Sequence, residues 1–535
     1  MFPRDRKYLL LVLAISTISL AYWLVFSWNL MSTFHEDVDL GLMAWNMYYY
    51  AHYTGQVFGL QLVVFGSHIA MDQLLVLPFY YLFQSPFTLL VVQDVVLTVT
   101  AIVIYLVSKD LVKDNRIALA FFIAFIVNPG VWGIIIYNYH TEMLIPLFYI
   151  LTFYFLMKTD TKLLLISLLL LLGVIEEAPL LAVTLAIGML SYDYIFTTDR
   201  RLKRKRMELS ALVLVVSVAV FWIYMSITSA LPYSYSPGGE YAAVPPALRI
   251  NAFVQGEVSQ IMSPLVTLYG ILWTPSNQAF VVFGLLLATA GFGIFFFFDP
   301  VTSFFLISPW LAVIFLTGNN TFLDINFQYY SYVISGTFVG ALLGILAVKS
   351  KRGPVSRRIF GRLGAPHSDG RVLSLAFYST LIIAGALFFV SIHFRMPVNV
   401  GTDLSRVFLF QSEWQPYVGQ IDSMLKLVPN NSTLLTILCV MPLASNRQYL
   451  EQTVWPADNV YKPQYILVDF DSNNITSVGY MLQEQRAYVD DYIKNSSDYS
   501  LYARNGSALL IRQADVTAPI NETKLIELIN STVTQ

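Results

Sequence analysis

The acidic stretch FHEDVDLG, residues 34–41, follows the first long apolar run of the chain. It brings Glu36, Asp37 and Asp39 close together along the chain, with His35 beside them. Carboxylates near an imidazole can accept a proton from a hydroxyl group or bind a divalent cation. We therefore interpret Asp39, Asp37 and Glu36 as candidate catalytic residues, against the ordinary alternative of a solvated loop.

More acids and histidines stand at the ends of apolar runs. The stretch NYHTE, residues 138–142, carries His140 and Glu142, and GVIEEAP, residues 173–179, carries Glu176 and Glu177 between two short apolar runs. Carboxylates close to lipid are costly unless they are paired, hydrated or functional. We expect these four residues, together with His68, to bind substrate in one cleft with Asp39; a polar hairpin tip is the plainer explanation of Glu176 and Glu177.

A divalent metal ion is the cofactor that such a cleft could hold. The candidate ligands are Asp37, Asp39 and His140, because carboxylate and imidazole groups both bind divalent cations. Neither the identity of the metal nor the need for one follows from the sequence.

Composition places the chain in a membrane. Of its 535 residues 56% are hydrophobic and only 12% are charged, and the mean hydropathy is +0.61. Soluble domains carry about 25% charged residues. The net charge of −2 argues against a nucleic-acid partner. The single cysteine, Cys439, excludes an intramolecular disulfide framework.

Long apolar runs predict about eleven membrane-spanning helices. They cover residues 8–30, 87–108, 117–135, 143–157, 163–175, 178–196, 208–228, 278–298, 301–317, 328–348 and 372–392. The run 68–84 is interrupted by Asp72, Gln73 and Pro78 and is expected to lie at the interface. Few ionisable residues are expected within the spans, apart from the Glu176–Glu177 turn.

Basic residues set the orientation. They recur in alternate loops, at residues 4–7, 109–116, 158–162, 199–206 and 349–362. Cytoplasmic loops carry the excess of Lys and Arg, so we expect the N-terminus inside, the C-terminus outside and a multi-pass protein of the plasma membrane. The glycosylation motif N-x-S/T occurs only on the expected outer side, at Asn319, Asn430, Asn431, Asn474, Asn495, Asn505, Asn521 and Asn530.

One cation is conspicuous on that outer side. Before residue 393, the predicted outer loops contain ten acids and a single basic residue, Arg249. A guanidinium group is a forked donor suited to a phosphate, so we predict that Arg249 clamps a lipid phosphate. Pairing with Glu240 or Glu257 is the alternative. Other outer acids, such as Asp72 and Asp324, are expected to be solvated.

Two domains are expected. Residues 1–395 form the transmembrane domain, with interfacial helices in the outer loops 31–86 and 229–277. Residues 396–535 form a small extracytoplasmic α/β domain, because buried-strand patterns at 433–440 and 465–470 precede a helical pattern at 477–495 and a hairpin at 500–512 that turns at Asn505-Gly506.

Several blocks of the sequence resemble a known family. VDLGLMAWN (38–46), NYHTEMLIPL (138–147), VIEEAPLLA (174–182) and QYYSYVISG (328–336) look like successive blocks of the prokaryotic membrane family called domain of unknown function 2079. Thr141 stands where that family has proline, and Glu176 where it has lysine. The layout is also similar to the C-type (GT-C) glycosyltransferases, which use polyprenyl-phosphate sugars; this resemblance implies that Asp39 or Asp37 is the catalytic carboxylate.

We therefore expect a membrane glycosyltransferase that moves a sugar from a polyprenyl-phosphate donor to an extracytoplasmic protein or lipid glycan. Its partners would be membrane lipid and the lipid-linked sugar. A transporter or lipid flippase is one alternative, which charged groups buried in the spans would support. A non-catalytic surface protein anchored by its spans is the other.

Overall fold

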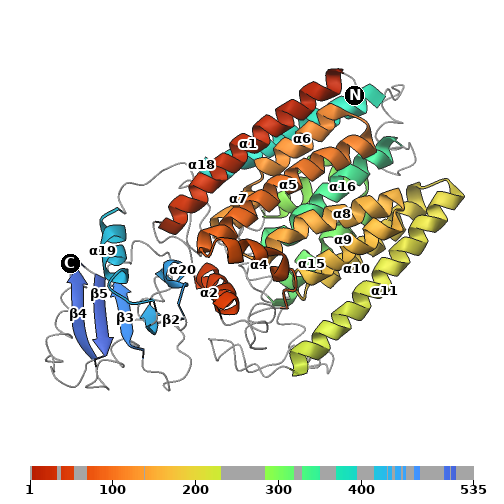
Figure 1. Cartoon of the computed structure of the whole chain (residues 1–535). Helices are drawn as coiled ribbons and strands as arrows, with labels where there is room; N and C mark the ends of the chain where they lie inside the picture. The colour runs from red at the N-terminus through yellow and green to blue at the C-terminus, as the bar shows by residue number, and fades with distance from the viewer. Residues whose placement is uncertain are drawn as a thin grey trace.

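The fold is a large helical bundle joined to a small mixed sheet (Figure 1). The computed structural model describes residues 3–32, 38–52, 69–137, 139–230, 284–317, 328–349, 369–393, 415–430, 432–436, 440–447, 450–452, 463–469, 499–506 and 508–513.

Eleven of the described helices build the bundle. They are α1 (Pro3–Ser32), α5 (Pro86–Val112), α6 (Asn115–Ile126), α7 (Pro129–Tyr137), α8 (Ile145–Lys158), α9 (Thr161–Gly173), α10 (Ala178–Phe196), α11 (Arg200–Ala230), α15 (Pro300–Thr317), α16 (Ser331–Lys349) and α18 (Asp369–His393). Within the described residues, eight helical segments are long and apolar enough to cross a membrane. The expected class, an α-helical polytopic membrane protein with a small α/β part, is confirmed.

The remaining expected spans differ among themselves. The run 163–175 coincides with the 13-residue helix α9, and the run 301–317 coincides with α15, an 18-residue helix that contains Pro309. In the run 278–298, the described part is helical only to Ala290 and continues as the 3₁₀ helix η2 (Ile294–Phe298). Gly293 lies between them at φ +96°, a backbone angle that favours glycine.

Local sequence signals explain where the helices begin and end. Ser85 caps α5 by accepting a hydrogen bond from the backbone N–H of Phe87, and Pro86 follows at the first helical position. Asp114 caps α6 in the same way, accepting from the N–H groups of Arg116 and Ile117. Asn128-Pro129 separates α6 from α7, because proline cannot donate to the preceding turn.

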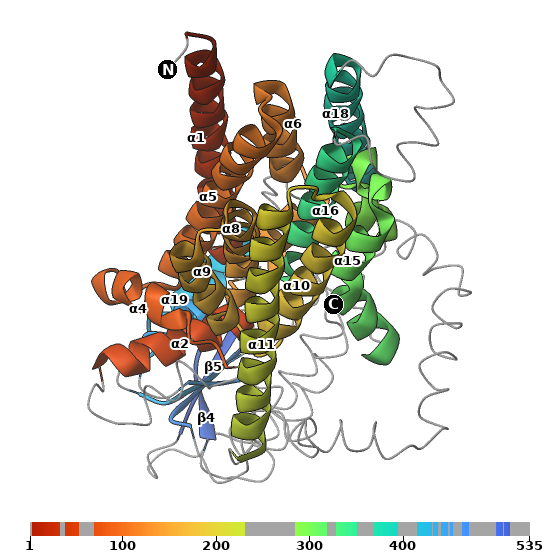
Figure 2. The same cartoon turned by 90° about the vertical axis from the view of Figure 1, so that its right-hand side faces the viewer.

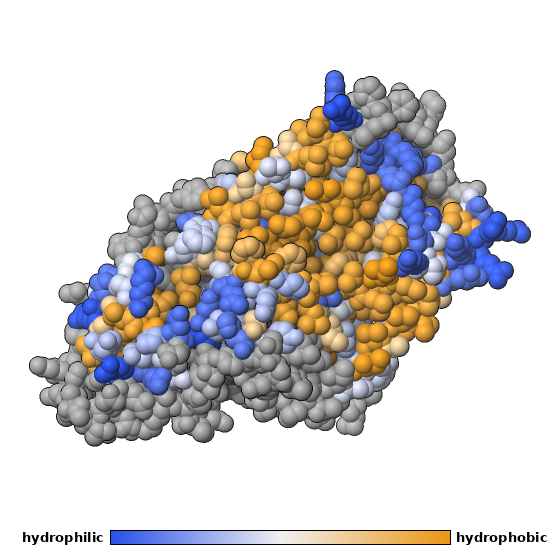
Figure 3. Space-filling view, viewed as in Figure 1, coloured by the Kyte–Doolittle hydropathy of each residue, from blue (hydrophilic) through white to orange (hydrophobic). Residues whose placement is uncertain are grey.

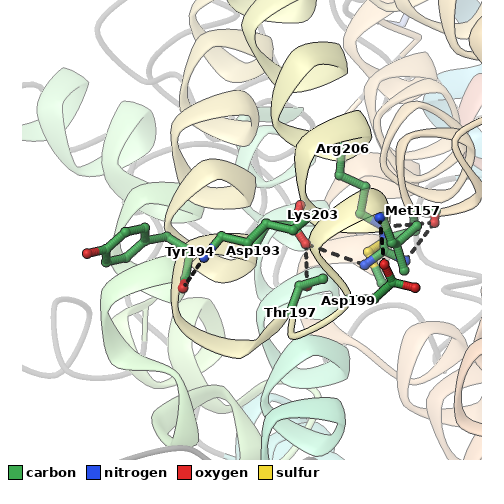
Figure 4. Close-up of polar contacts among 8 residues, drawn as sticks. Met157, Asp193, Tyr194, Thr197, Asp199, Lys203 and Arg206 are labelled. Carbon is green, nitrogen blue, oxygen red and sulfur yellow. Dashed lines mark hydrogen bonds and ion pairs between the residues drawn. The ribbon is translucent and has the colours of Figure 1, made fainter.

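One end of the bundle is basic, and it is called the basic end below. Lys158 and Lys113 both pair with Asp110, and Lys349 Nζ donates to the carbonyl of Val112 at 2.9 Å. Figure 4 shows Arg206 donating to the carbonyl of Met157 at 2.7 Å and contacting Asp193. These contacts tie the ends of α5, α8, α10, α11 and α16 together.

The opposite end, called the sheet end, carries the sheet. A broad apolar surface separates the hydrophilic residues of the two ends (Figure 3). Two helices that follow α1, α2 (Val38–His52) and α4 (Gln73–Leu82), lie at this end between the bundle and the strands (Figures 1 and 2). On α4, Val76 and Tyr80 are buried while Leu75, Phe79 and Leu82 are exposed. An exposed apolar face on a ten-residue helix is typical of a helix in the membrane interface.

The sheet has five strands in the order β2-β1-β3-β5-β4. They are β1 (Leu434–Thr436), β2 (Leu450–Gln452), β3 (Tyr465–Asp469), β4 (Tyr499–Asn505) and β5 (Ala508–Gln513). β1 pairs in parallel with β2 and β3, whereas β5 is antiparallel to β3 and β4. The expected hairpin turns at Asn505-Gly506, where Gly506 has φ +59°. The helices α19 (Gln415–Leu425) and α20 (Met441–Ala444) complete this part. The helical pattern at 477–495 lies outside the described residues.

Direct contacts hold α2 and α4 against the sheet domain. Trp45 Nε1 donates to the carbonyl of Arg447 at 3.1 Å, and Tyr80 Oη donates to Asn446 Oδ1 at 3.1 Å. Gly41 lies so close to α20 that a Cβ there would come within 2.6 Å of the Met441 Cβ. The sheet domain therefore fixes the orientation of α2, the helix that carries Asp39.

Candidate functional site

Asp39, His140 and Glu142 lie in a row at the sheet end. The carboxylate Oδ2 of Asp39 lies 3.4 Å from Nε2 of His140, whose Nδ1 lies 3.7 Å from Oε2 of Glu142. The His140 and Glu142 side chains are 10% and 4% exposed, whereas that of Asp39 is 35% exposed. A buried imidazole that links a buried acid to an accessible one can pass or hold a proton at the accessible end.

Two local structures position this row. Asp39 occupies the first turn of α2, where the helix dipole stabilises a carboxylate. His140 is extended and precedes the 3₁₀ helix η1 (Thr141–Leu144), which places Glu142 in its first turn. The Tyr137 ring stacks on the imidazole with 5.2 Å between centroids. The stacked ring and the two carboxylates beside the imidazole nitrogens therefore limit how far the His140 ring can turn.

Tyr329, in the short helix η4 (Gln328–Tyr330), faces the same acids. Its pKa is raised, first by burial and then by the negative charges of Glu142, Asp39 and Glu177. Its phenol therefore stays protonated at neutral pH and can donate a hydrogen bond. η4 sits against Gly130 of α7, where a Cβ would come within 2.6 Å of the Tyr330 ring.

The Glu176–Glu177 turn borders this row. Both side chains are partly buried, and Glu176 Oε2 accepts a hydrogen bond from the backbone N–H of Ile69 at 2.8 Å. Glu177 is the residue before α10 and is close enough to Tyr329 to raise its pKa. Glu177 thus faces the row, while Glu176 also holds the chain that leads into α4.

The expectation that Asp72 is a solvated loop acid is wrong. Asp72 is 6% exposed, and its backbone N–H donates to the carbonyl of Gly173 at 3.0 Å. Gly173 permits this approach, because a Cβ there would come within 2.7 Å of Asp72 Oδ1. Burial raises the pKa of Asp72 to about 7. Sequence spacing carries no signal for this, because the packing of α4 on the α9–α10 turn is tertiary.

Tyr139 is a further buried polar residue that the sequence pattern does not single out. It is fully buried, and within the described part of the chain its hydroxyl has no hydrogen-bond partner. Burial, then Glu142 and Asp72, raises its pKa. The charges of both Asp72 and Glu142 therefore act on the buried Tyr139 hydroxyl.

Several predicted site residues lie outside the described residues: Glu36, Asp37, His68 and Arg249, as does Asp324 of a predicted outer loop. Their roles stay predictions.

Within the described residues there is no group of three or more His, Cys, Asp or Glu side chains that could hold a metal ion. Asp39 and His140 supply two ligands, so a site there would need Asp37 or another residue. Of the glycosylation motifs, Asn430 and Asn505 are described, and both are exposed.

The spans are less free of ionisable groups than expected. Asp94, the ninth of the 27 residues of α5, is fully buried, and its Oδ2 accepts a hydrogen bond from Ser27 of α1 at 3.0 Å. Asp193 of α10 is also buried, but it lies near the basic end and contacts Arg206 and Thr197. Of these two acids, Asp94 is therefore the one that lies away from the basic end and is hydrogen-bonded to a neutral side chain, that of Ser27.

Comparison with known proteins gives a family and two distant structural likenesses. No curated protein matches the sequence. The structure of ArnT from Cupriavidus metallidurans bound to undecaprenyl phosphate has a TM-score of 0.46 and 10% identity, covering 96% of this chain and 99% of that one. The same protein in the apo state gives 0.47 and 11%, covering 97% and 100%. A family model described as "Predicted membrane protein (DUF2079)" matches residues 47–509. This chain belongs to the DUF2079 family of predicted membrane proteins.

Proposed function

We propose that the protein is a membrane glycosyltransferase that transfers a sugar from a polyprenyl-phosphate donor to an acceptor outside the cytoplasm. The observation that supports this most is the row Asp39–His140–Glu142 at the sheet end, with only its Asp39 end accessible. The basic end would face the cytoplasm, because Lys and Arg accumulate there. The sheet domain and the row would then face outward.

The row suits the proton transfer that this reaction needs. An acceptor hydroxyl attacks the anomeric carbon of the sugar, so that its new C–O bond forms as the bond from sugar to phosphate breaks. Asp39 takes the hydroxyl proton, and His140 with Glu142 behind it stabilises the resulting charge distribution. The polyprenyl phosphate leaves with the electron pair of the broken bond. Tyr329 can donate a hydrogen bond to a sugar or phosphate oxygen in the same space.

A lipid-borne donor fits the surroundings of the row. The exposed apolar face of α4, with Leu75, Phe79 and Leu82, suits the polyprenyl chain beside the protein. The acids on this side would repel the phosphate unless a cation offsets them. Arg249 is the cation that we propose for this role, on the evidence of the sequence alone. Such a group stabilises a leaving phosphate by charge-assisted hydrogen bonds.

The test is transfer by the purified full chain in proteoliposomes. A panel of radiolabelled polyprenyl-phosphate sugars is supplied, and water-soluble or acceptor-bound label is measured. The proposal expects release or transfer from at least one donor that Asp39→Asn abolishes. Absence of turnover on every donor, with a correctly folded protein, contradicts it.

One observation favours a transporter or flippase instead, namely the buried Asp94 within α5. An ionisable residue inside a span commonly marks a proton or substrate path. The two functions respond differently to Asp94→Asn, which keeps the size of the side chain and a carbonyl acceptor for Ser27. A glycosyltransferase keeps its transfer activity in this variant. A proton-coupled transporter loses pH-driven uptake into proteoliposomes.

A further inference from the structure

A groove between α10 and α11 at the basic end lies apart from the row. Its volume is about 560 Å³. The lining residues are Leu190, Arg200, Lys203, Arg204, Met207, Glu208 and Ala211. Three of these are basic and one is acidic, so the groove has a positive balance next to an apolar floor. Binding sites for small ligands have volumes of about 300–1,000 Å³.

The basic residues of the groove differ in how far other groups of the protein neutralise their charge. Arg204 Nε pairs with Glu208 at 2.8 Å, but both side chains are more than half exposed, at 83% and 60%. Lys203 Nζ donates to the carbonyl of Tyr194 and lies over its ring, as Figure 4 shows for the hydrogen bond. A carbonyl does not neutralise the ammonium charge. By contrast, Arg206 points inward to Asp193 and Met157 and is not available to a ligand.

The position of the groove matches the headgroup level of a bilayer. Trp222 is 66% exposed and lies about 27 Å further along α11 than Arg204, at about 1.5 Å per residue. This is close to the roughly 30 Å thickness of the hydrocarbon core. Beyond Glu208, the exposed residues that precede Trp222 are apolar, among them Leu212, Val215 and Val218. Tyr194, 72% exposed beside the groove, is a typical interfacial aromatic residue.

We propose that this groove binds an anionic phospholipid of the leaflet at the basic end. The phosphate lies between Arg200, Lys203 and Arg204, and an acyl chain runs over Met207 and Ala211 toward the middle of α11. Charge complementarity and the apolar floor select this ligand over a zwitterionic lipid, which lacks the net negative charge, and over free phosphate, which has no chain to bury. The bound lipid braces α10 against α11; at the other ends of these helices, Glu177 precedes α10 and Tyr224 of α11 donates to the carbonyl of Leu172.

The test compares lipid binding by the purified full chain in neutral detergent, measured by native mass spectrometry with phosphatidylglycerol and phosphatidylcholine. Phosphatidylglycerol should bind at least about tenfold more tightly, since each basic residue near a membrane surface contributes about fivefold. The triple variant Arg200→Gln, Lys203→Gln, Arg204→Gln should reduce this preference to about twofold or less.

Two further variants distinguish a lipid site in the groove from a general effect of positive charge at the basic end. The matched triple Lys113→Gln, Arg116→Gln, Lys162→Gln removes the same charge from the same end, outside the groove, and should keep the preference. Ala211→Phe fills the apolar floor without changing charge and should weaken phosphatidylglycerol binding. The proposal is overturned if the matched triple loses as much as the groove triple, if Ala211→Phe binds like the original protein, or if millimolar inorganic phosphate displaces the lipid.

Discussion

The imidazole of His140 lies 3.4 Å from the carboxylate of Asp39, joining the first turn of α2 to the segment that precedes α8. The first element comes from the segment after α1 that packs on the sheet domain, and the second leads into the bundle. The contact therefore exists only when the sheet domain, α2 and the bundle are assembled. In the proposed reaction this is the point at which the acceptor's proton is removed.

Asp39→Asn should lower transfer by about 10²–10⁴-fold, the usual contribution of a general base. His140→Gln keeps a polar side chain but cannot accept a proton, and it should cost about tenfold or more. Turnover per folded molecule is the measurement. Asp422→Asn, which removes an exposed carboxylate of α19 paired with Lys426, is the control and should leave turnover unchanged. Equal effects of Asp39→Asn and Asp422→Asn would remove Asp39 from the mechanism.

Asp72 should make folding stability depend on pH. Burial raises its pKa to about 7 from the ordinary 3.8. As pH rises from about 4 to 7, the unfolded chain releases a proton that the folded chain retains, so the free energy of unfolding falls across this interval. Below about pH 4 the carboxyl group is protonated in both states and does not change the free energy of unfolding with pH. Above about pH 7 it lowers that free energy by a constant amount, on the order of 4 kcal/mol. In thermal unfolding in detergent, the stability of Asp72→Asn relative to the original protein should increase as the pH is raised from 4 to 8. A stability difference between the two proteins that does not change with pH would contradict a raised pKa of a buried Asp72 carboxyl group.

Gly344 should tolerate no side chain. It lies in α16, and a Cβ there would overlap the backbone carbonyl oxygen of Phe295. Backbone cannot move as a flexible side chain does, so Gly344→Ala should lower the free energy of unfolding by about 1–3 kcal/mol or more. Gly385, in α18, is the matched control, because a Cβ added there would meet no atom within 4 Å. Gly385→Ala should be neutral or slightly stabilising because alanine favours helix. Similar melting temperatures for the two variants would contradict the close helix packing.

The sequence predicts where the membrane spans end and which acids lie close together. Apolar runs and alternating basic loops indicate a polytopic bundle, and the position of His140 and Glu142 at a run's end suggests that they approach Asp39. These are one-dimensional signals, since lipid imposes length and charge rules on each segment separately.

Other features depend on contacts that no local pattern encodes. Asp72 is buried because Gly173 offers no side chain at the place where α4 docks. The strand β2 has only three residues, Leu450–Gln452, and is fixed by pairing with β1. Arg447 is 3% exposed and packs on α2 through Trp45, although its sequence context is that of an ordinary basic residue of the sheet domain. Asp94 lies within a predicted span, where its apolar neighbours give no sign of its hydrogen bond to Ser27.

Arg249 should act on the donor rather than on folding. A charged hydrogen bond to phosphate contributes about 1.5–3 kcal/mol, so Arg249→Ala should weaken donor use about tenfold or more. Arg249→Lys should recover only part of this because the forked geometry is lost. The measurement is the dependence of transfer on donor concentration. If Arg249→Ala lowers the melting temperature and leaves turnover per folded molecule unchanged, then Arg249 pairs with Glu240 or Glu257 to hold the loop.

The most direct measurement of the central claim is the pool of lipid-linked sugars in cells that lack the protein. The proposed reaction consumes a polyprenyl-phosphate sugar, so loss of the protein should raise the amount of one such lipid. Complementation with the original chain or with Asp94→Asn should restore the pool, whereas Asp39→Asn, produced at the same level in the membrane, should not. An unchanged pool in the deletion strain, or full restoration by Asp39→Asn, would contradict a glycosyltransferase that works through Asp39.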